Sequence, residues 1–393
     1  MKHASDKEIG KVKMETWKKA KLGEITDSSL GKMLDKEKNK GQLQPYLANW
    51  NVRWGYFDLD NLSLMKFEDS EDEKYGLNYG DIIICEGGEP GRCAIWKNQI
   101  PKMKIQKALH RVRCHKNIDN FFLFYQLLIL GKNKIFDQFT TGSTIKHIPA
   151  EQLKKVPIVY PPLPTQQKIA SILSAYDNLV QNYKKQIEAL QTAASELYKE
   201  WFVRFRFPGY QTTKFENGIP EGWKVVLASE LGEFIRGKNI TAEEMQEGMI
   251  PVISAGIEPS GFHNQSNVKG VSLTISNSGA NAGYLQINYS DIWAADCSYC
   301  NNSKNIYFYY ELLNNVRVVL FNLQKGAAQP HVYAKDINKM KILLPPSELI
   351  ETANNKIKLM HEKVYSLQQQ ITNLTRQRDL LLPRLMSGKL EVK

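Results

Sequence analysis

The sequence predicts an α+β protein that is built twice: two similar mixed α/β domains, joined by two long helices that pair as an antiparallel coiled coil. Three observations support this prediction. The chain of 393 residues matches itself at an offset that places Gly142 over Gly326, two polar stretches repeat apolar residues with the coiled-coil period, and a Pro-Pro pair precedes each stretch. Such a duplication implies a pseudo-two-fold internal repeat.

The internal repeat is the strongest signal in the sequence. Residues 142–163 lie over residues 326–347 without a gap, and the match continues through the polar stretch that follows. Upstream the offset changes, as loop insertions would require, and residues 81–91 lie over residues 273–283. Each copy is therefore predicted to be a mixed α/β domain that ends in Pro-Pro and is followed by a helix.

The repeat predicts four segments. Domain 1 covers residues 1–160, a first helical region covers 161–209, domain 2 covers 210–344 and a second helical region covers 345–393. A run rich in Gly and Pro, residues 207–222, is typical of a domain boundary and separates the first helical region from domain 2.

The two helical regions are predicted from apolar residues spaced alternately by four and three positions, which is the seam of a coiled coil. The first seam consists of Ile169, Leu173, Tyr176, Val180, Tyr183, Ile187, Leu190, Ala194, Leu197 and Trp201. The second consists of Ala353, Ile357, Met360, Val364, Leu367, Ile371, Leu374, Arg378, Leu381 and Leu385. Arg378 interrupts it, and a long Arg stem can carry its charge out of a seam. An ordinary bundle core is the alternative, but two matched seams favour mutual pairing, with antiparallel pairing giving each helix an equivalent environment.

Composition limits the class of protein. Hydrophobic residues make up 42% and charged residues 24%, which excludes wholesale disorder. The net charge of +11 favours a polyanionic partner, either nucleic acid or an anionic membrane surface. Five cysteines are too few for a disulfide scaffold, the N-terminus has no apolar signal sequence, and the apolar stretch 121–130 is too short to cross a bilayer. We therefore expect a cytoplasmic protein without a membrane partner.

Catalytic signatures are missing from the sequence. It contains no P-loop, no dinucleotide-binding glycine pattern, no HExxH and no GxSxG. Cys297 and Cys300 form a single CxxC without a second pair of ligands, and the acidic run 68–73 is typical of a solvated loop. We expect neither a catalytic residue, nor a metal site, nor a cofactor in this chain.

The positive charge is concentrated in domain 1, where residues 97–116 contain no acidic residue. Domain 2 is nearly neutral. Basic and amide side chains of this run are predicted to contact phosphates and base edges: Lys97, Asn98, Gln99, Lys102, Lys104, Gln106, Lys107, Arg111 and Arg113. The alternative is a solvated strand pair, because Ile105, Leu109 and Val112 look like core positions. In domain 2 the candidates are amides, which can read bases or form turns: Asn264, Gln265, Asn277 and Asn281.

At this point the sequence resembles a known family. Three segments carry the resemblance: PIVYPPLPTQQKIASIL at 157–173, the link from RFRFPGY to GIPEGWK at 204–224, and LLPRLMSGKLEV at 381–392. Their order and the duplication together resemble the specificity subunits of Type I restriction–modification systems. One departure is that the second copy has Ile350 where the first has Gln166, so its helix is expected to begin differently.

The resemblance implies a DNA-recognition subunit without catalytic activity. Domains 1 and 2 would be target-recognition domains that each read one half of a bipartite, asymmetric site in double-stranded DNA. The two helical regions would set the spacer and dock two modification subunits, which methylate adenine with S-adenosylmethionine. Restriction subunits, with motor and nuclease activity that uses ATP and Mg²⁺, would join the complex.

We expect two equivalent loops, Thr141–His147 and Lys325–His331, to lie near DNA. The candidate contacts in them are Thr141, Gly142, Ser143, Lys146, His147, Lys325, Gly326, Gln329 and His331. The two glycines would allow close approach of the backbone, while a packing role for the two histidines stays open. Residues 166–202, at ~1.5 Å each, would form a rod of roughly 55 Å that spans about 16 base pairs at ~3.4 Å each. The competing classes are a single-chain methyltransferase and a coiled-coil scaffold that binds no DNA.

Overall fold

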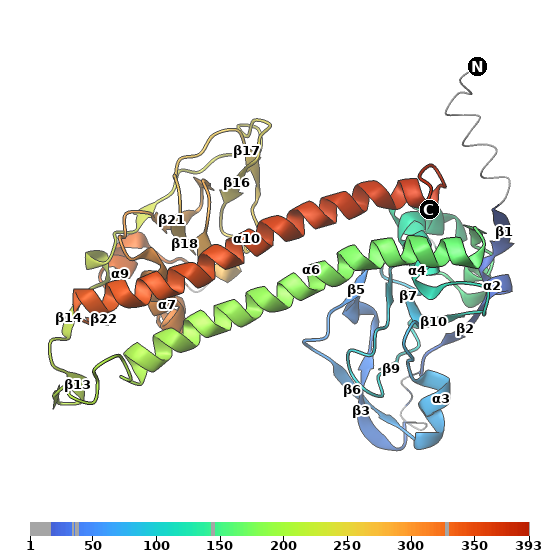
Figure 1. The fold of residues 1–393 in the computed structure, drawn as a ribbon, viewed down its shortest axis with the longest axis horizontal. Coiled ribbons are helices and arrows are strands. Elements are labelled where there is room, and N and C mark those ends of the chain that lie inside the picture. Colours follow the sequence, from blue (N-terminus) through green and yellow to red (C-terminus); the bar gives the residue numbers. More distant parts are fainter. Residues whose placement is uncertain (1–16, 34, 36–38, 143–145, 327–329, 393) are drawn as a thin grey trace. The chain divides into compact units, whose positions relative to one another are not determined.

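The structure is a computed structural model that describes residues 17–33, 35, 39–142, 146–326 and 330–392 (Figure 1). The chain forms two compact units: unit 1 comprises Met1–Val180 and Thr372–Lys393, and unit 2 comprises Gln181–Ile371. Each unit contains part of each long helix, because the units are defined by which residues pack together. They therefore do not test the boundaries of the four predicted segments, which stay a prediction. Within the described residues, no helix is long and apolar enough to cross a membrane.

The described residues of unit 1 form four sheets. Its strands are β1 (Lys18–Lys21), β2 (Thr26–Leu30), β3 (Gln42–Leu47), β4 (Val52–Arg53), β5 (Tyr56–Phe57), β6 (Ser63–Phe67), β7 (Ile82–Cys85), β8 (Cys93–Ile95), β9 (Lys104–Ile105), β10 (Leu109–Cys114) and β11 (Pro157–Tyr160). The central sheet has the order β2-β10-β7-β8 and is antiparallel. A second sheet has the order β6-β3-β9, in which β3 and β9 are parallel, and β1 pairs with β11. A short hairpin, β4-β5, is added to this plan.

Unit 2 repeats three of the sheets of unit 1. Its strands are β12 (Phe215–Glu216), β13 (Ile219–Pro220), β14 (Lys224–Leu227), β15 (Ile235–Arg236), β16 (Ile250–Ile253), β17 (Gly261–His263), β18 (Ser272–Ser276), β19 (Leu285–Asn288), β20 (Trp293–Ala294), β21 (Cys297–Cys300) and β22 (Lys341–Leu344). The order β15-β21-β18-β19 matches the central sheet of unit 1, β17-β16-β20 matches the second sheet, and β14-β22 matches β1-β11. The pairs β4-β5 and β12-β13 each occur in one unit of the described residues. The predicted internal repeat is therefore confirmed in the pairing of strands.

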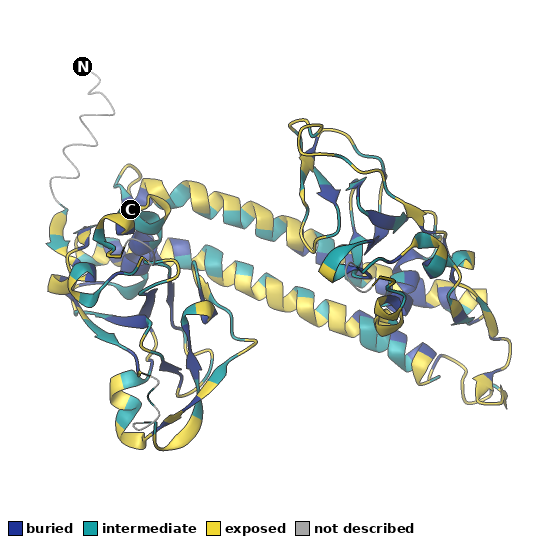
Figure 2. Cartoon of the chain, turned by 180° about the vertical axis from the view of Figure 1, so that it is seen from behind, coloured by how far each residue is buried: buried dark blue, intermediate teal, exposed yellow. Residues whose placement is uncertain are grey.

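The core of each unit lies where a helix covers the central sheet (Figure 2). The short helices are α2 (Leu22–Ile25), α3 (Asp72–Tyr75), α4 (Asn120–Lys132) and α5 (Ala150–Leu153) in unit 1, and α7 (Ile306–Asn315), α8 (Arg317–Asn322) and α9 (Ala334–Asn338) in unit 2. The apolar run that begins at Phe121 forms α4, which starts where the Asp119 carboxylate accepts a hydrogen bond from Phe122 N at 2.9 Å. The run Ile82–Cys85 is buried on both faces, as expected of a central strand covered by a helix.

The two long helices are α6 (Leu163–Tyr198) and α10 (Ser347–Met386), and no position of either predicted seam is exposed. In unit 1, Ile169 and Leu173, early in α6, share a core with Leu385, late in α10. In unit 2, Ala194, late in α6, shares a core with Ile357, early in α10. Each unit therefore contains an antiparallel helix pair, as predicted, and a single turn of π-helix, Lys199–Val203, continues α6 through the seam residue Trp201.

Arg378 does leave the seam, and it does so toward a specific partner. Its guanidinium donates from Nη1 to Asp177 Oδ1 on α6 at 2.5 Å, and also contacts Asp379. Asp177 in turn accepts a hydrogen bond from the Tyr125 hydroxyl at 2.5 Å, so the ion pair connects both long helices to α4.

The different residues at the two helix starts have different tasks. Gln166 is completely buried, and its side-chain oxygen accepts from Asp119 N at 2.9 Å while its nitrogen donates to Pro161 O at 2.8 Å. Ile350, at the equivalent position of the second copy, instead packs in the apolar core of unit 2. There the Asn354 side chain accepts from Phe308 N at 3.2 Å and connects α10 to α7. In the first repeat the hydrogen bonds at the helix start are thus made by Gln166. In the second repeat the equivalent residue packs in the core, and Asn354, four residues later, makes the hydrogen bond.

One detail of the predicted alignment is wrong by a residue. Gly91 and Gly283 are equivalent, because Gly91 N donates to Cys85 O and Gly283 N donates to Ser276 O. The strand residue equivalent to Cys85 is therefore Ser276, not Asn277. The turn after β18 contains one residue more than the turn after β7, which an ungapped alignment of these segments could not show.

Candidate nucleic-acid interface

Two equivalent loops are closed by the same pair of main-chain hydrogen bonds, and we call them the bridged loops. In unit 1, Thr141 N donates to His147 O at 2.8 Å and His147 N donates to Thr141 O at 3.0 Å. In unit 2, Lys325 and His331 exchange the same two bonds, both at 2.9 Å. Each loop has a glycine with positive φ directly after its first bridge residue, Gly142 at 92° and Gly326 at 96°.

The bridged loops are the loops that the sequence predicted to lie near DNA, and most of their candidate residues are exposed or half-buried. Thr141, Gly142, Lys146, Lys325 and Gly326 are exposed. His147 and His331 are half-buried, and His147 Nε2 lies 3.1 Å from Thr141 Oγ1, across the base of the loop. The predicted contacts Ser143 and Gln329 lie outside the described residues.

Each bridged loop is hydrogen-bonded to a turn of the central sheet, the turn after β7 in unit 1 and the turn after β18 in unit 2. Ile148 N, just after the loop of unit 1, donates to Glu86 O at 2.7 Å. Val332 N, just after the loop of unit 2, donates to Asn277 O at 2.9 Å. Main-chain bonds therefore hold both ends of each loop.

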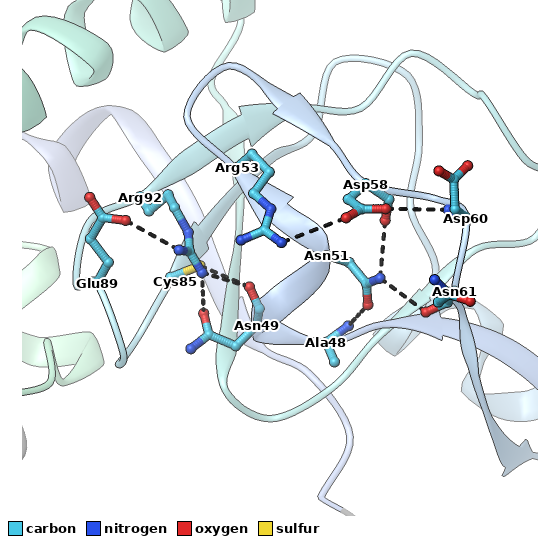
Figure 3. A network of polar contacts seen from close by, with 10 residues as sticks. All are labelled: Ala48, Asn49, Asn51, Arg53, Asp58, Asp60, Asn61, Cys85, Glu89 and Arg92. Carbon is cyan, nitrogen blue, oxygen red and sulfur yellow. Dashed lines mark hydrogen bonds and ion pairs between the residues drawn. The ribbon is translucent and has the colours of Figure 1, made fainter. Parts of the chain in front are cut away.

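A polar network fixes the neighbouring loop of unit 1 (Figure 3). Arg92 donates to the backbone oxygen of Asn49 at 2.9 Å and pairs with Glu89 at 3.2 Å, while Asn49 Nδ2 donates to Gly87 O at 2.8 Å. Asn51 Oδ1 accepts from Ala48 N at 2.9 Å. This network ties the segment that starts at Asn49 to the turn after β7, next to the bridged loop.

Two exposed aromatic residues lie in the same segment. Trp50 is 53% exposed and Tyr56 is 54% exposed. Large exposed aromatic rings beside basic groups are typical of nucleic-acid contacts. The sequence reasoning missed these residues and the network around Arg92, because it weighed charge density, whereas isolated aromatic residues far from the basic run carried the signal.

Three cations of the predicted basic run have structural roles instead. Lys104 is 1% exposed, and its ammonium lies 2.5 Å from Asp72. Arg111 is 7% exposed and donates to Gly76 O at 2.7 Å. Arg113 forms a two-pronged ion pair with Asp81 at 2.8 and 3.0 Å. We therefore withdraw Lys104, Arg111 and Arg113 from the candidate contacts, since a buried or bidentate cation is already paired.

For the centre of residues 97–116 the alternative prediction, a pair of strands with core positions, is correct. Ile105, Leu109 and Val112 are each 0% exposed. Burial lowers the pKa of Arg111, with a smaller effect from the neighbouring Arg113 charge. The periodicity of apolar residues was a better guide here than the charge count.

The remaining residues of the run divide into two groups. Lys97 donates to Asn178 on α6 at 3.1 Å and lies over the Phe121 ring, so it faces the helix, and burial lowers its pKa. The others are mostly exposed and stay candidates: Asn98, Gln99, Lys102 and Lys107, with Gln106 half-buried. Asn98 and Lys102 both have positive φ, which places them in tight turns.

The amide candidates of unit 2 occupy two places. Asn264 and Gln265 are exposed directly after β17, where Asn264 donates to Gln246 at 2.8 Å. Asn277 and Asn281 lie in the turn after β18, beneath the bridged loop of that unit. Asn277 is 6% exposed, and its side-chain oxygen accepts from Ser298 Oγ at 2.6 Å.

Cations and an aromatic ring surround the bridged loop of unit 2. Lys325 pairs with Asp336 at 2.7 Å, and the His331 ring is stacked with Tyr333 at 6.1 Å between centroids. Lys335 lies over the Tyr333 ring. Arg236 is 64% exposed at its side chain and makes only a loose ion pair with Asp296 at 3.8 Å.

The CxxC residues lie inside the sheet of unit 2. Cys297 and Cys300 are buried in β21, and burial raises their pKa to about 12 and about 11. Thiols with such pKa values are protonated near neutral pH, so they are weak nucleophiles. Among the residues that the structure describes, no group of three potential metal ligands occurs.

These features define a class: a duplicated α+β protein with one bridged loop per repeat and an antiparallel helix pair in each unit. Comparison with known families gives the particular family. The sequence profile of the Type I restriction modification DNA specificity domain matches residues 14–192 and again residues 220–375. The chain belongs to this family, and its role is DNA recognition, while catalysis lies in other subunits.

Relatives and a solved structure agree with this assignment. The chain is 27% identical over 343 residues to the MjaIX specificity subunit of a Type I restriction enzyme from Methanocaldococcus jannaschii, covering 80% of this chain and 78% of that protein. It is 25% identical to the putative MjaX specificity subunit of the same organism, covering 98% and 96%. The crystal structure of a Type I restriction–modification S subunit from M. genitalium has the same fold, with a TM-score of 0.63, 20% identity and coverage of 94% and 96%.

Proposed function

We propose that this chain is the subunit that selects a bipartite DNA site, with each unit reading one half and the long helices setting the spacer. The observation that carries the proposal is that the same two main-chain hydrogen bonds close a bridged loop in both units, and that each loop is bonded to an equivalent turn. Two copies of one reading element, with different side chains, suit a site whose halves differ in sequence.

The charges around each loop support contact with DNA. Lys146 is exposed beside the first bridged loop, and Lys325 and Lys335 lie beside the second. Lys102 and Lys107 add exposed cations in unit 1. Such cations supply affinity for phosphates without reading sequence, so base selection is left to the loops and to their supporting turns.

Helix length supports the proposed spacer role. α6 has 36 residues and α10 has 40, so at ~1.5 Å per residue they extend about 54 and 60 Å. A rigid element of this length suits a fixed number of base pairs between half-sites. Removing one heptad from both helices is expected to shorten the preferred spacer and to leave both half-site sequences unchanged.

The outer faces of the helices support docking of other subunits. In unit 1, Ile172, Leu179 and Leu380 are exposed on α6 and α10, although each is apolar. A groove of about 530 Å³ is lined by Ile172 and its neighbours on α6, and by Leu381, Leu390 and other residues of the C-terminal segment. We propose that two modification subunits dock on the helices, and that S-adenosylmethionine, ATP and Mg²⁺ are bound by partner subunits.

The test is to sequence the methylome of cells that express this chain with its modification and restriction partners. The expected result is one bipartite motif with two defined halves and a fixed spacer. The heptad deletion in α6 and α10 should shift only the spacer. A methylated motif without a gap, or half-sites that change with helix length, would contradict the proposal.

A further inference from the structure

The turn beneath each bridged loop contains one position whose chemistry is opposite in the two repeats. The structural equivalence of Glu86 and Asn277 rests on two hydrogen bonds in each unit. Glu86 N donates to Ala108 O at 3.0 Å and Glu86 O accepts from Ile148 N. Asn277 N donates to Asp296 O at 3.3 Å, and Asn277 O accepts from Val332 N. The same place therefore holds a carboxylate in unit 1 and a carboxamide in unit 2.

In unit 2 this position lines a small cavity of about 30 Å³, which leaves room for about one water-sized group. Its walls include Arg236, Asn277, Ser298, His331 and Tyr333. The Asn277 oxygen already accepts one hydrogen bond from Ser298 and keeps one lone pair, whereas the NH₂ group has two N–H donors to offer. Among the described residues nothing accepts from that NH₂ group, and Arg236 adds guanidinium donors beside it.

In unit 1 different residues stand at the equivalent strand positions. His110 occupies the place of Ser298, is 0% exposed and lies 3.0 Å from Ile148 O through Nε2. Leu30 occupies the place of Arg236, since it pairs with His110 as Arg236 pairs with Ser298. The donors of unit 2 are therefore missing from this unit.

What remains in unit 1 is the Glu86 carboxylate. It is half-buried at the edge of the bridged loop, and no cation among the described residues forms an ion pair with it. An unpaired carboxylate on a surface that meets DNA phosphates is repelled unless a hydrogen-bond donor compensates it. The donors that DNA offers are the exocyclic amino groups of the bases, and a Glu side chain accepts from the N4 amino group of cytosine.

We propose that Glu86 and the Arg236–Asn277 pair are specificity-determining residues, each for one half-site. Glu86 selects a base edge with an amino group, cytosine N4 or adenine N6. Arg236, which presents donors only, and Asn277, which presents mainly its NH₂ group, select an edge with acceptors, as guanine presents with O6 and N7. The Asn277 oxygen already accepts one hydrogen bond from Ser298, so we expect this side chain to contribute mainly its NH₂ group to the contact. This inference rests on the proposed function.

The experiment uses two conservative exchanges in the full chain, expressed with its partner subunits. Glu86→Gln keeps the shape of the side chain and replaces acceptor oxygens by a mixed amide. Arg236→Leu introduces the residue that unit 1 has at this place, and Arg236 is exposed, so folding is not at risk. Control variants are Glu151→Gln on α5, which is exposed far along the chain from the turn, and Asn315→Asp at the end of α7.

Methylome sequencing gives the outcome for each variant, and methylation of oligonucleotides that differ at one base pair gives its size. We expect Glu86→Gln to relax one position in one half-site by about tenfold or more, and Arg236→Leu to relax a guanine in the other half-site by a similar factor, since a good side-chain contact discriminates by about 1–3 kcal/mol. The controls should leave the motif unchanged.

Three results would overturn the inference. They are an unchanged motif in both variants, changes in both halves from one variant, or a relaxed position that is not of the expected base type. The wild-type chain separates this failure from failure of the proposed function, because a wild-type motif that is not bipartite would contradict the latter. Equal melting temperatures for wild type and variants show that folding is not the cause of a change.

Discussion

The two repeats share their strand order but differ in the polar group that connects a domain helix to a long helix. In unit 1 the group is Asp177, half-buried, which accepts from Tyr125 on α4 and pairs with Arg378. In unit 2 the equivalent position is His361, which is 1% exposed and lies 3.2 Å from the buried Glu311 of α7 and 2.8 Å from the Tyr289 hydroxyl.

This difference shows which parts of a duplicated fold are fixed. Strand pairing and the seam depend on main-chain bonds and apolar volume, so they are kept in both copies. The buried polar group has to be satisfied within its own neighbourhood, and each copy has found its own set of partners. The junctions of the two units therefore differ in energy, and this can be tested by breaking each of them separately.

The largest effect is expected for Glu311→Ala. Its removal takes away the hydrogen-bond partner of His361 Nε2 and leaves a cavity in a fully buried site, which together should cost about 3–5 kcal/mol. Hydrogen exchange followed by mass spectrometry should show faster exchange in α7 and unchanged exchange in α4. Equal acceleration in both helices would mean that the junctions are not independent. Glu311→Gln, which keeps a hydrogen-bonding group, is the matched control and should cost less.

Asp177→Ala should give the opposite pattern with a smaller effect. Arg378 keeps Asp379 as a partner and both side chains are partly exposed, so we expect a loss of about 1–3 kcal/mol. Exchange should rise in α4 and not in α7. The Tyr125 hydroxyl, whose pKa is raised by burial and then by the Asp177 charge, should titrate at lower pH in this variant, which absorbance at 295 nm follows.

Gln166→Ile tests whether the two helix starts can be exchanged. The variant carries the residue that the second copy has at this position, but Asp119 N loses its acceptor at the start of α4. The expected cost is about 1–3 kcal/mol, as for a buried donor left without a partner. Urea unfolding measures it. A stability equal to wild type would show that apolar packing alone is sufficient at this position. Asn354→Leu is the matching test in unit 2.

The smallest effect on stability, and a clear effect on binding, is expected for Lys102→Ala with Lys107→Ala. Both lysines are exposed, so the free energy of unfolding should stay within about 0.5 kcal/mol of the wild-type value. Loss of two phosphate contacts should reduce the slope of log binding constant against log salt by about two for random duplex. Arg113→Ala should instead lower stability and leave the slope unchanged, because Arg113 is paired with Asp81.

The sequence was sufficient for the repeat and for both seams, because periodicity is local and does not depend on the partner. It also led to the bridged loops, since His147 and His331 stand at equivalent positions of the repeat. The sequence predicted that the two domains would have the same strand order, because they are copies. It did not predict what that order is, which only the structure shows.

What failed depended on contacts between distant positions. Lys104 and Arg113 looked like free cations, because their partners Asp72 and Asp81 come from other parts of the chain. The partner of Arg378 is separated from it by the whole of unit 2 in sequence. The contrast between Glu86 and Asn277 was hidden by one extra residue in a turn, which shifts the alignment at the position that matters.

The main-chain closure of the bridged loops has a consequence for how such proteins diversify. Backbone N–H and C=O groups are present in every residue except proline, which lacks the N–H, so the hydrogen bonds at Thr141–His147 and Lys325–His331 are indifferent to almost any side-chain exchange between them. A lineage can therefore replace the content of such a segment by recombination or point mutation without first acquiring compensating changes in the core. The side chains of the loop can therefore change while the main-chain bonds that close it stay the same.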